Sequence, residues 1–254
     1  MHFVSSGTGT PVILIHGLFG NLDNLKSLGK ELESQHQVIR VDLPNHGLSE
    51  HWDDTDYDKL AQAFERLLNQ IHVQRAHFVG HSMGGKVAMA FALRYPEKVI
   101  SLVAADIAPV AYAPRHETVF NGLTSLPLVG HTDRRYALTH LLNAGIDDGT
   151  AQFLLKNLQR TEDGFSWKMN LVGLQDSYAN IIGWQNNEKS FNGPSLFIRG
   201  GDSDYVTAAH RDAILAQFPN VQAKTIEGTG HWLHAQKPVI FNRIVADFIN
   251  KYDM

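Results

Sequence analysis

A chain of 254 residues is long enough for one α/β domain carrying an insertion, and its core needs no disulfide or metal. Its 43% hydrophobic and 19% charged residues are ordinary for a globular protein, and its formal net charge of −4 argues against a nucleic-acid partner, which would require a clustered basic face. It has no cysteine, which excludes thiolate nucleophiles, disulfides and thiolate metal sites.

Targeting signals are not evident in the sequence. Residues 1–7 lack a basic region and a long apolar run, so no signal peptide is expected. No apolar stretch approaches the length that crosses a bilayer. The expectation is a cytoplasmic protein with no membrane or nucleic-acid partner, and the sequence leaves its oligomeric state open.

Short apolar segments alternate with helical patterns through most of the chain, which is typical of a mostly parallel sheet with helices on both faces. The expected strands are residues 11–15, 37–41, 76–80, 99–105, 196–199 and 221–226. The expected helices are residues 22–34, 57–71, 83–95 and 239–248. The third helix is small or apolar on nearly every side, so we expect it against the centre of the sheet.

Residues 109–192 break this alternation. They contain four helical patterns and a polar turn at 162–164, with no clear parallel strand. We therefore expect a helical cap at 109–192, inserted over the strand ends of an α/β core formed by residues 1–108 and 193–254.

The segment Gly80-His81-Ser82-Met83-Gly84 matches the nucleophile-elbow pattern G-x-S-x-G, between an apolar strand and a glycine- and alanine-rich helix. Glycine is needed because the turn is sharp and flanking side chains would collide with neighbouring elements. The turn would raise the Ser82 hydroxyl above the sheet at a helix N-terminus, where developing negative charge is favoured. Ser82 is therefore the expected nucleophile.

A phosphate-binding loop is the main rival interpretation of the same segment. Residues 80–87 nearly fit G-x-x-x-x-G-K-[ST], also between a strand and a helix. The pattern fails at Val87, which has no hydroxyl to ligate magnesium.

An oxyanion hole requires two N–H donors aimed at the reacting carbonyl oxygen. One is expected from Met83, the residue after the nucleophile, and the other from the loop after the first core strand, residues 16–20. Within that loop we expect the Leu18 N–H, with Phe19 as the second candidate.

The expected general base is His231, which follows the last strand between glycine and tryptophan. His234 is close enough in sequence to compete for the role. The spacing of these two histidines could suggest a metal, but no carboxylate or cysteine cluster accompanies them, so no metal is expected.

The acid of the triad has more than one candidate. Catalytic residues on open α/β sheets gather at the carboxyl ends of strands. Asp106 ends one strand, and Asp202 and Asp204 follow the next. These residues leave the choice of acid open.

These motifs together resemble the α/β-hydrolase superfamily and, within it, the YbfF-like esterases. The matching segments are residues 16–24, 42–49, 80–84, 106–110, 199–203 and 230–234. The resemblance implies Asp106 as the acid, with Ser203 as a helper beside the histidine, and no cofactor. It also implies a serine hydrolase acting on small-molecule carboxylic esters, with acyl thioesters as a further class, of small to medium acyl chains.

Other functions could use the same residues. A carbon–carbon bond hydrolase or a cofactor-free perhydrolase would keep the Ser82 triad. Haloalkane dehalogenases and epoxide hydrolases carry an aspartate on the elbow, so Ser82 excludes them. A non-catalytic small-molecule receptor is the alternative from another class; such receptors often lose a triad member, whereas each role has a candidate in this sequence.

Overall fold

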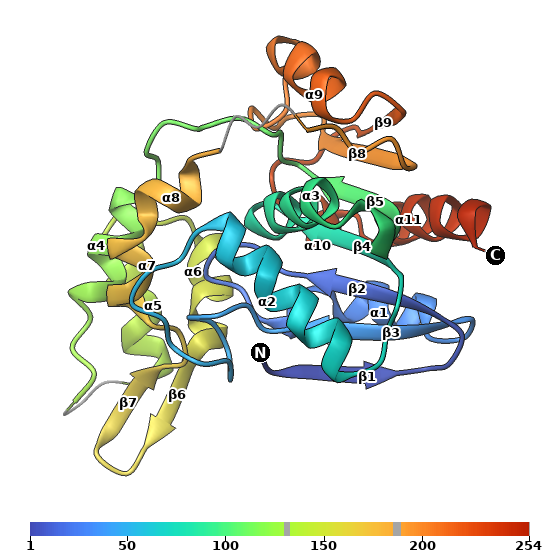
Figure 1. The fold of residues 1–254 in the computed structure, drawn as a ribbon. Coiled ribbons are helices and arrows are strands. Elements are labelled where there is room, and N and C mark those ends of the chain that lie inside the picture. Colours follow the sequence, from blue (N-terminus) through green and yellow to red (C-terminus); the bar gives the residue numbers. More distant parts are fainter. Residues whose placement is uncertain (130–132, 185–188, 254) are drawn as a thin grey trace.

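A central seven-stranded sheet forms the core of the computed structural model, which describes residues 1–129, 133–184 and 189–253 (Figure 1). The strand order is β1-β3-β2-β4-β5-β8-β9, and every neighbouring pair is parallel except β1 with β3. The strands are β1 Phe3–Ser6, β2 Thr10–Ile15, β3 His36–Val41, β4 Ala76–His81, β5 Val99–Ala105, β8 Ser195–Gly200 and β9 Val221–Ile226. The expected α/β class is confirmed.

Each expected strand lies within one residue of an observed one at both ends. Strand β1 was not expected. It has only four residues and pairs with a neighbour on one side, so it lacks the long apolar run that marks a buried parallel strand.

Helices cover both faces of the sheet. Successive side chains of β2 point to opposite faces, so they pack against different helices. Ile13 and Ile15 belong to the cluster that contains helices α2 (Tyr57–Gln70) and α3 (Met83–Arg94). Val12 and Leu14 belong to the cluster on the opposite face. That face is covered by α1 (Lys26–Leu32) and α11 (Pro238–Tyr252), as Figure 1 shows.

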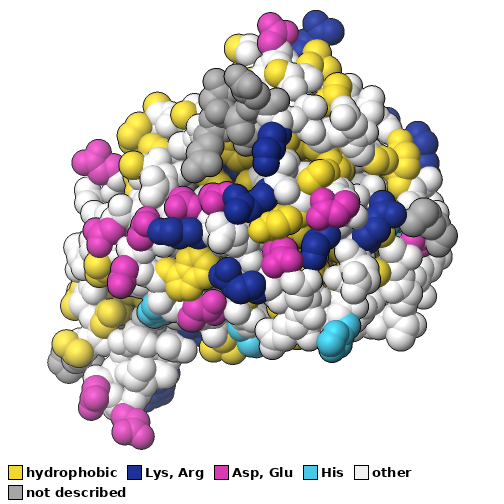
Figure 2. Space-filling view, in the orientation of Figure 1, with side chains coloured by type: hydrophobic (Ala, Val, Ile, Leu, Met, Phe, Trp, Pro, Cys, Tyr) yellow, Lys and Arg dark blue, Asp and Glu magenta, His cyan; other side chains and the backbone are white. Residues whose placement is uncertain are grey.

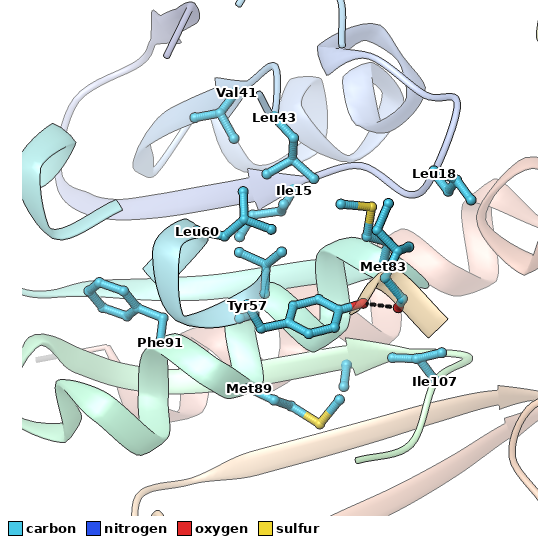
Figure 3. Packing of buried hydrophobic residues seen from close by; sticks show 14 of the residues in the cluster. Ile15, Leu18, Val41, Leu43, Tyr57, Leu60, Met83, Met89, Phe91 and Ile107 are labelled. Atoms are coloured by element: carbon cyan, nitrogen blue, oxygen red, sulfur yellow. Dashed lines mark hydrogen bonds between the residues drawn. The ribbon is translucent and has the colours of Figure 1, made fainter. Parts of the chain in front are cut away.

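Helix α3 lies on the centre of the sheet, as expected from its composition. Its residues are buried at ten positions, and the Phe91 ring stacks on Phe78 of β4 with ring centres 4.5 Å apart. Figure 3 shows Phe91 and Met89 of this helix beside Leu60 and Tyr57 of α2.

Helix α11 continues four residues beyond the expected end at 248, and the helices differ from expectation in three further places. The predicted helix at 22–34 is a 3-10 turn, Leu22–Leu25, followed by α1. Two short helices were missed, α9 (Arg211–Gln217) and α10 (Leu233–Gln236). Seven and four residues are too few to establish a helical period in the sequence.

Between β5 and β8, the described residues form five α-helices, a short 3-10 helix and a two-stranded antiparallel hairpin. This segment lies at one end of the sheet (Figure 1). The helices are α4 Glu117–Thr124, α5 Arg134–Asn143, α6 Asp148–Leu154, α7 Leu171–Asp176 and α8 Tyr178–Ile182. Strands β6 (Leu158–Thr161) and β7 (Gly164–Trp167) pair across the polar turn that the sequence marked at 162–164. The described part of the segment thus has one α-helix more than the four expected patterns, and its two strands are antiparallel, where no parallel strand was expected.

Opposite charges are mixed on the face formed by α2 and α3. Figure 2 shows Lys and Arg side chains interspersed with Asp and Glu across this view. Ion pairs account for part of this pattern, including Arg94 with Asp58 and Lys98 with Glu65.

No helix in the described part of the chain is long and apolar enough to cross a membrane.

The close approach of α3 to β2 yields a stability prediction. A methyl group at Gly84 would lie 2.4 Å from the carbonyl oxygens of Ile15 and His16. Because backbone atoms must move to relieve this overlap, Gly84→Ala should lower the free energy of unfolding by about 1–3 kcal/mol or more, measured by urea denaturation. The control is Gly149→Ala at an exposed position of α6, where the new methyl meets only the Asp147 side chain, at 3.3 Å. Equal effects of the two substitutions would contradict the argument.

Candidate active site

Ser82 lies at a sharp turn between β4 and α3. Its backbone has φ 54° and ψ −122°, a region that side-chain-bearing residues rarely adopt. The turn brings two backbones so close that a methyl group at Gly80 would lie 2.1 Å from the Gly84 carbonyl oxygen. The Ser82 N–H donates to the carbonyl of Ala105 at 2.9 Å, which ties the turn to β5. This geometry accounts for the glycines in the motif.

A chain of hydrogen bonds joins Ser82 to His231 and His231 to Asp106. Ser82 Oγ lies 2.9 Å from His231 Nε2, and His231 Nδ1 lies 2.8 Å from Asp106 Oδ2. Asp106 directly follows β5, and His231 lies between β9 and α10. Three strand ends therefore bring together a serine, a carboxylate and a histidine that are far apart in the sequence and follow one another in that order.

The three candidate acids lie in different environments. Asp106 is fully buried and also accepts hydrogen bonds from the Gly200 N–H, at 2.9 Å, and from the Ser203 hydroxyl. The side chain of Asp204 is 76% exposed and pairs with Arg115 at 3.0 Å. Asp202 is exposed as well. Asp106 is thus the carboxylate that meets His231.

Two residues that the sequence did not single out also hold His231. The Tyr205 ring stacks on the imidazole with ring centres 3.7 Å apart and planes 16° apart. His81 Nε2–H donates to the His231 carbonyl oxygen at 2.8 Å. Burial, with His234 and His231 nearby, lowers the pKa of His81 well below its usual value, so it acts as a neutral donor. Only the position of His81 inside the elbow motif could have indicated its role.

The candidate oxyanion-hole donors lie at the start of α3 and in the loop after β2. Met83 begins α3, so its N–H has no partner within the helix. The Phe19 N–H donates to His46 Nε2 at 3.1 Å and is therefore occupied. In the described residues no hydrogen bond is recorded for the Leu18 N–H, which leaves it available. The loop lies against the nucleophile, since a methyl group at Gly17 would come 3.2 Å from Ser82 Cβ.

Two buried histidines hold this loop. His46 accepts from Phe19 at Nε2, so its Nδ1–H donates to the Pro44 carbonyl at 2.9 Å. His16 Nε2 accepts from the Leu43 N–H at 3.0 Å. Desolvation lowers the pKa of both, that of His46 to about 3, so both are neutral near pH 7. Neutrality is required because a protonated imidazole could not accept these bonds.

Two small cavities adjoin Ser82, and Leu18 and His116 line both. The first has a volume of about 50 Å³ and is walled mainly by Val119, Phe153, Leu154 and Trp232. The second has a volume of about 30 Å³ and is walled mainly by Tyr57, Ile107, Tyr112, Ile181, Ile182 and Tyr205. Both are predominantly apolar.

His231 and His234 face different neighbours. The His234 ring packs against His81 with centres 4.3 Å apart, while His231 faces Ser82. No group of three potential ligands that could hold a metal ion occurs among residues 1–129, 133–184 and 189–253.

The role of His46 in the loop can be tested. His46→Leu leaves the buried Phe19 N–H and Pro44 carbonyl without their partners, so the free energy of unfolding should fall by about 1–3 kcal/mol in urea denaturation. His51→Leu makes the same chemical change at an exposed position and should have little effect. Unchanged stability of the His46 variant would show that the loop does not depend on this imidazole.

Comparison with known proteins assigns the family. Residues 10–238 match the model of the α/β hydrolase fold family. The chain is 39% identical to Esterase YbfF of Escherichia coli (strain K12), over 95% of this chain and 93% of that protein. It is 36% identical to the sn-1-specific diacylglycerol lipase ABHD11 of Mus musculus, over 94% of this chain and 80% of that protein.

A solved structure agrees with these relatives. A marine microorganism esterase superposes with a TM-score of 0.94 at 36% identity, covering 97% of this chain and 98% of its own. Fold, family model and relatives therefore coincide over nearly the whole chain, and the chain belongs to the α/β-hydrolase fold family as a hydrolase of the esterase–lipase class.

Proposed function

We propose that this protein is a serine esterase that hydrolyses carboxylic esters of small to medium acyl chains through an acyl-enzyme on Ser82. The observation that carries the proposal is the continuous hydrogen-bond chain from Ser82 Oγ through His231 to Asp106, at 2.9 and 2.8 Å. The names of the relatives, an esterase and a diacylglycerol lipase, support ester chemistry.

Acylation begins when His231 Nε2 takes the hydroxyl proton of Ser82, whose oxygen attacks the acyl carbonyl. The Met83 and Leu18 N–H groups stabilise the oxyanion. His231 then gives its proton to the leaving alcohol, and the acyl group remains on Ser82. Water enters, loses a proton to His231 and attacks the acyl-enzyme; His231 then returns that proton to the Ser82 oxygen as the acyl bond breaks, which releases the acid and restores the serine.

Asp106 keeps the proton of the neutral imidazole on Nδ1, so that Nε2 faces Ser82, and it stabilises the imidazolium that forms during each step. A buried carboxylate must be hydrogen-bonded to remain in place. The Ser203 hydroxyl donates to the same Oδ2 atom that meets His231, and the Gly200 N–H donates to Oδ1. We assign Ser203 this auxiliary role of orienting the carboxylate.

The volumes of the two cavities beside Ser82 are consistent with the small to medium acyl groups proposed. At about 50 and 30 Å³, with mostly apolar walls, they suit short hydrocarbon groups on either side of the reacting carbonyl. The region between β5 and β8, our proposed cap at 109–192, contributes part of these walls, including Phe153, Leu154 and Ile181. Thioesters react by the same steps and are the second substrate class to assay.

Covalent labelling distinguishes an enzyme from a non-catalytic receptor. A fluorophosphonate probe should label the intact protein, because His231 makes the Ser82 oxygen nucleophilic, and Ser82→Ala should abolish labelling in the mass spectrum. Hydrolysis of p-nitrophenyl acetate should disappear in the same variant. If the folded wild-type protein neither labels nor hydrolyses the ester, the proposed function is wrong and a receptor is favoured.

The acid assignment has a matched pair of substitutions. Asp106→Asn removes the charge that orients and stabilises His231, so kcat should fall by about 10⁴-fold. Asp204→Asn removes a carboxylate that pairs with Arg115 at the surface and should leave kcat close to that of the wild type. An inactive Asp204→Asn together with an active Asp106→Asn would overturn the assignment.

A further inference from the structure

Lys86 is a buried cation that the proposed mechanism does not use. It is the lysine of the near-match to a phosphate loop, and it lies on α3 one turn after Ser82. The residue is only 1% exposed, and its Nζ donates to the carbonyl oxygens of Ile182, at 2.9 Å, and Gly183, at 2.8 Å. Its donors are thus directed at backbone oxygens.

Three aromatic rings also lie near the Lys86 ammonium. Nζ lies 4.8 Å from the centre of the Tyr112 ring, 5.6 Å from Tyr57 and 6.0 Å from Trp184. Burial lowers the pKa of Lys86 to about 7. Because the ammonium carries three N–H bonds and the neutral amine two, both forms can hold the two carbonyls.

The carbonyls that Lys86 holds belong to the end of α8. The last carbonyls of a helix lack partners within the helix and need donors from elsewhere. The Tyr57 hydroxyl donates to the Ile181 carbonyl at 2.5 Å, the dashed line in Figure 3. The Tyr112 N–H donates to the Ile182 carbonyl at 2.9 Å. Donors from α2, α3 and the segment after β5 therefore fix three successive carbonyls, of which Lys86 holds two.

The end of α8 is also a wall of the active-site region. Ile181 and Ile182 line the cavity of about 30 Å³ beside Ser82, and Lys86 lines it as well. One rigid turn of α3, about 5.4 Å of rise, separates Ser82 from Lys86. Lys86 therefore links this wall to Ser82 through a single helix, in addition to the contacts from Tyr57 and Tyr112.

We infer that Lys86 is a positioning residue that holds the end of α8 as a fixed wall beside Ser82 and thereby limits the length of the acyl group accepted. The inference rests on the proposed function, because an acyl preference presupposes acyl transfer at Ser82. It goes further by assigning that preference to one buried side chain and the backbone oxygens it binds.

The test uses Lys86→Met, which keeps an unbranched apolar stem, one heavy atom shorter than lysine, and removes the N–H donors. With the wall released, the ratio of kcat/KM for p-nitrophenyl hexanoate to that for p-nitrophenyl acetate should rise about tenfold, the scale on which apolar pockets discriminate chain length. The gain should come from a lower KM for the hexanoate. Amide hydrogen exchange across α8 (Tyr178–Ile182) should accelerate in the same variant.

Lys30→Met is the matched control, because this lysine is exposed on α1, on the face of the sheet opposite α3. It should leave both the substrate ratio and the exchange of α8 unchanged. Should Lys86→Met fail to fold, Tyr57→Phe removes the donor to the Ile181 carbonyl and keeps the ring, so it should shift both measurements in the same direction by less.

Two negative outcomes are distinguishable. A wild-type ratio and wild-type exchange in folded Lys86→Met, or in Tyr57→Phe where the first variant does not fold, would overturn the role of Lys86 while ester hydrolysis stands. A wild-type protein that neither hydrolyses the esters nor labels at Ser82 would overturn the proposed function and this inference together.

Discussion

The structure around the site depends on one steric constraint, the contact between the backbones of β4, α3 and the loop after β2. Methyl groups at Gly80 or Gly84 would lie 2.1–2.4 Å from carbonyl oxygens of neighbouring elements. Because no side chain separates these backbones, the turn at Ser82 can reach φ 54° and place the hydroxyl beside Gly17. The glycines permit this approach, and the fold on either side supplies the packing that maintains it.

Backbone strain occurs in three loops of the site, each of which follows a different strand. Phe19, Ser82 and Asp106 all have positive φ, at 60°, 54° and 51°, which costs on the order of 1–3 kcal/mol each. Each strained residue also donates its backbone N–H in a good hydrogen bond: Phe19 to His46, Ser82 to Ala105, and Asp106 to Ile198 at 2.7 Å. These bonds offset part of the strain and tie each loop to an adjacent strand or loop.

How well the sequence predicted each feature depended on how far apart along the chain the interacting residues lie. Buried parallel strands are continuous apolar runs, and the elbow is a local turn with obligatory glycines, so both were predicted to within a residue. The choice between Asp106 and Asp204 depends on which carboxylate reaches His231, 27 or more residues away in the chain, and the residues alone left it open. The stacking of Tyr205, the donor role of His81 and the contacts of Lys86 are likewise long-range, and no spacing rule encodes them.

The histidines illustrate how burial sorts chemically identical side chains. The sequence has 14 of them, and position after the last strand indicates His231 without assigning roles to the others. Desolvation lowers the pKa of His16, His81 and His234, the last to about 3, and these rings serve as neutral donors, acceptors or packing groups. Of the described imidazoles that contact the elbow, His231 is the one hydrogen-bonded to a carboxylate. In the proposed mechanism, a proton released from Ser82 would therefore meet one imidazole that is hydrogen-bonded to a carboxylate, while the surrounding rings are held neutral by their burial. Under the proposed function, the neutral surroundings would direct proton transfer to His231, just as the strained turn would direct attack through Ser82.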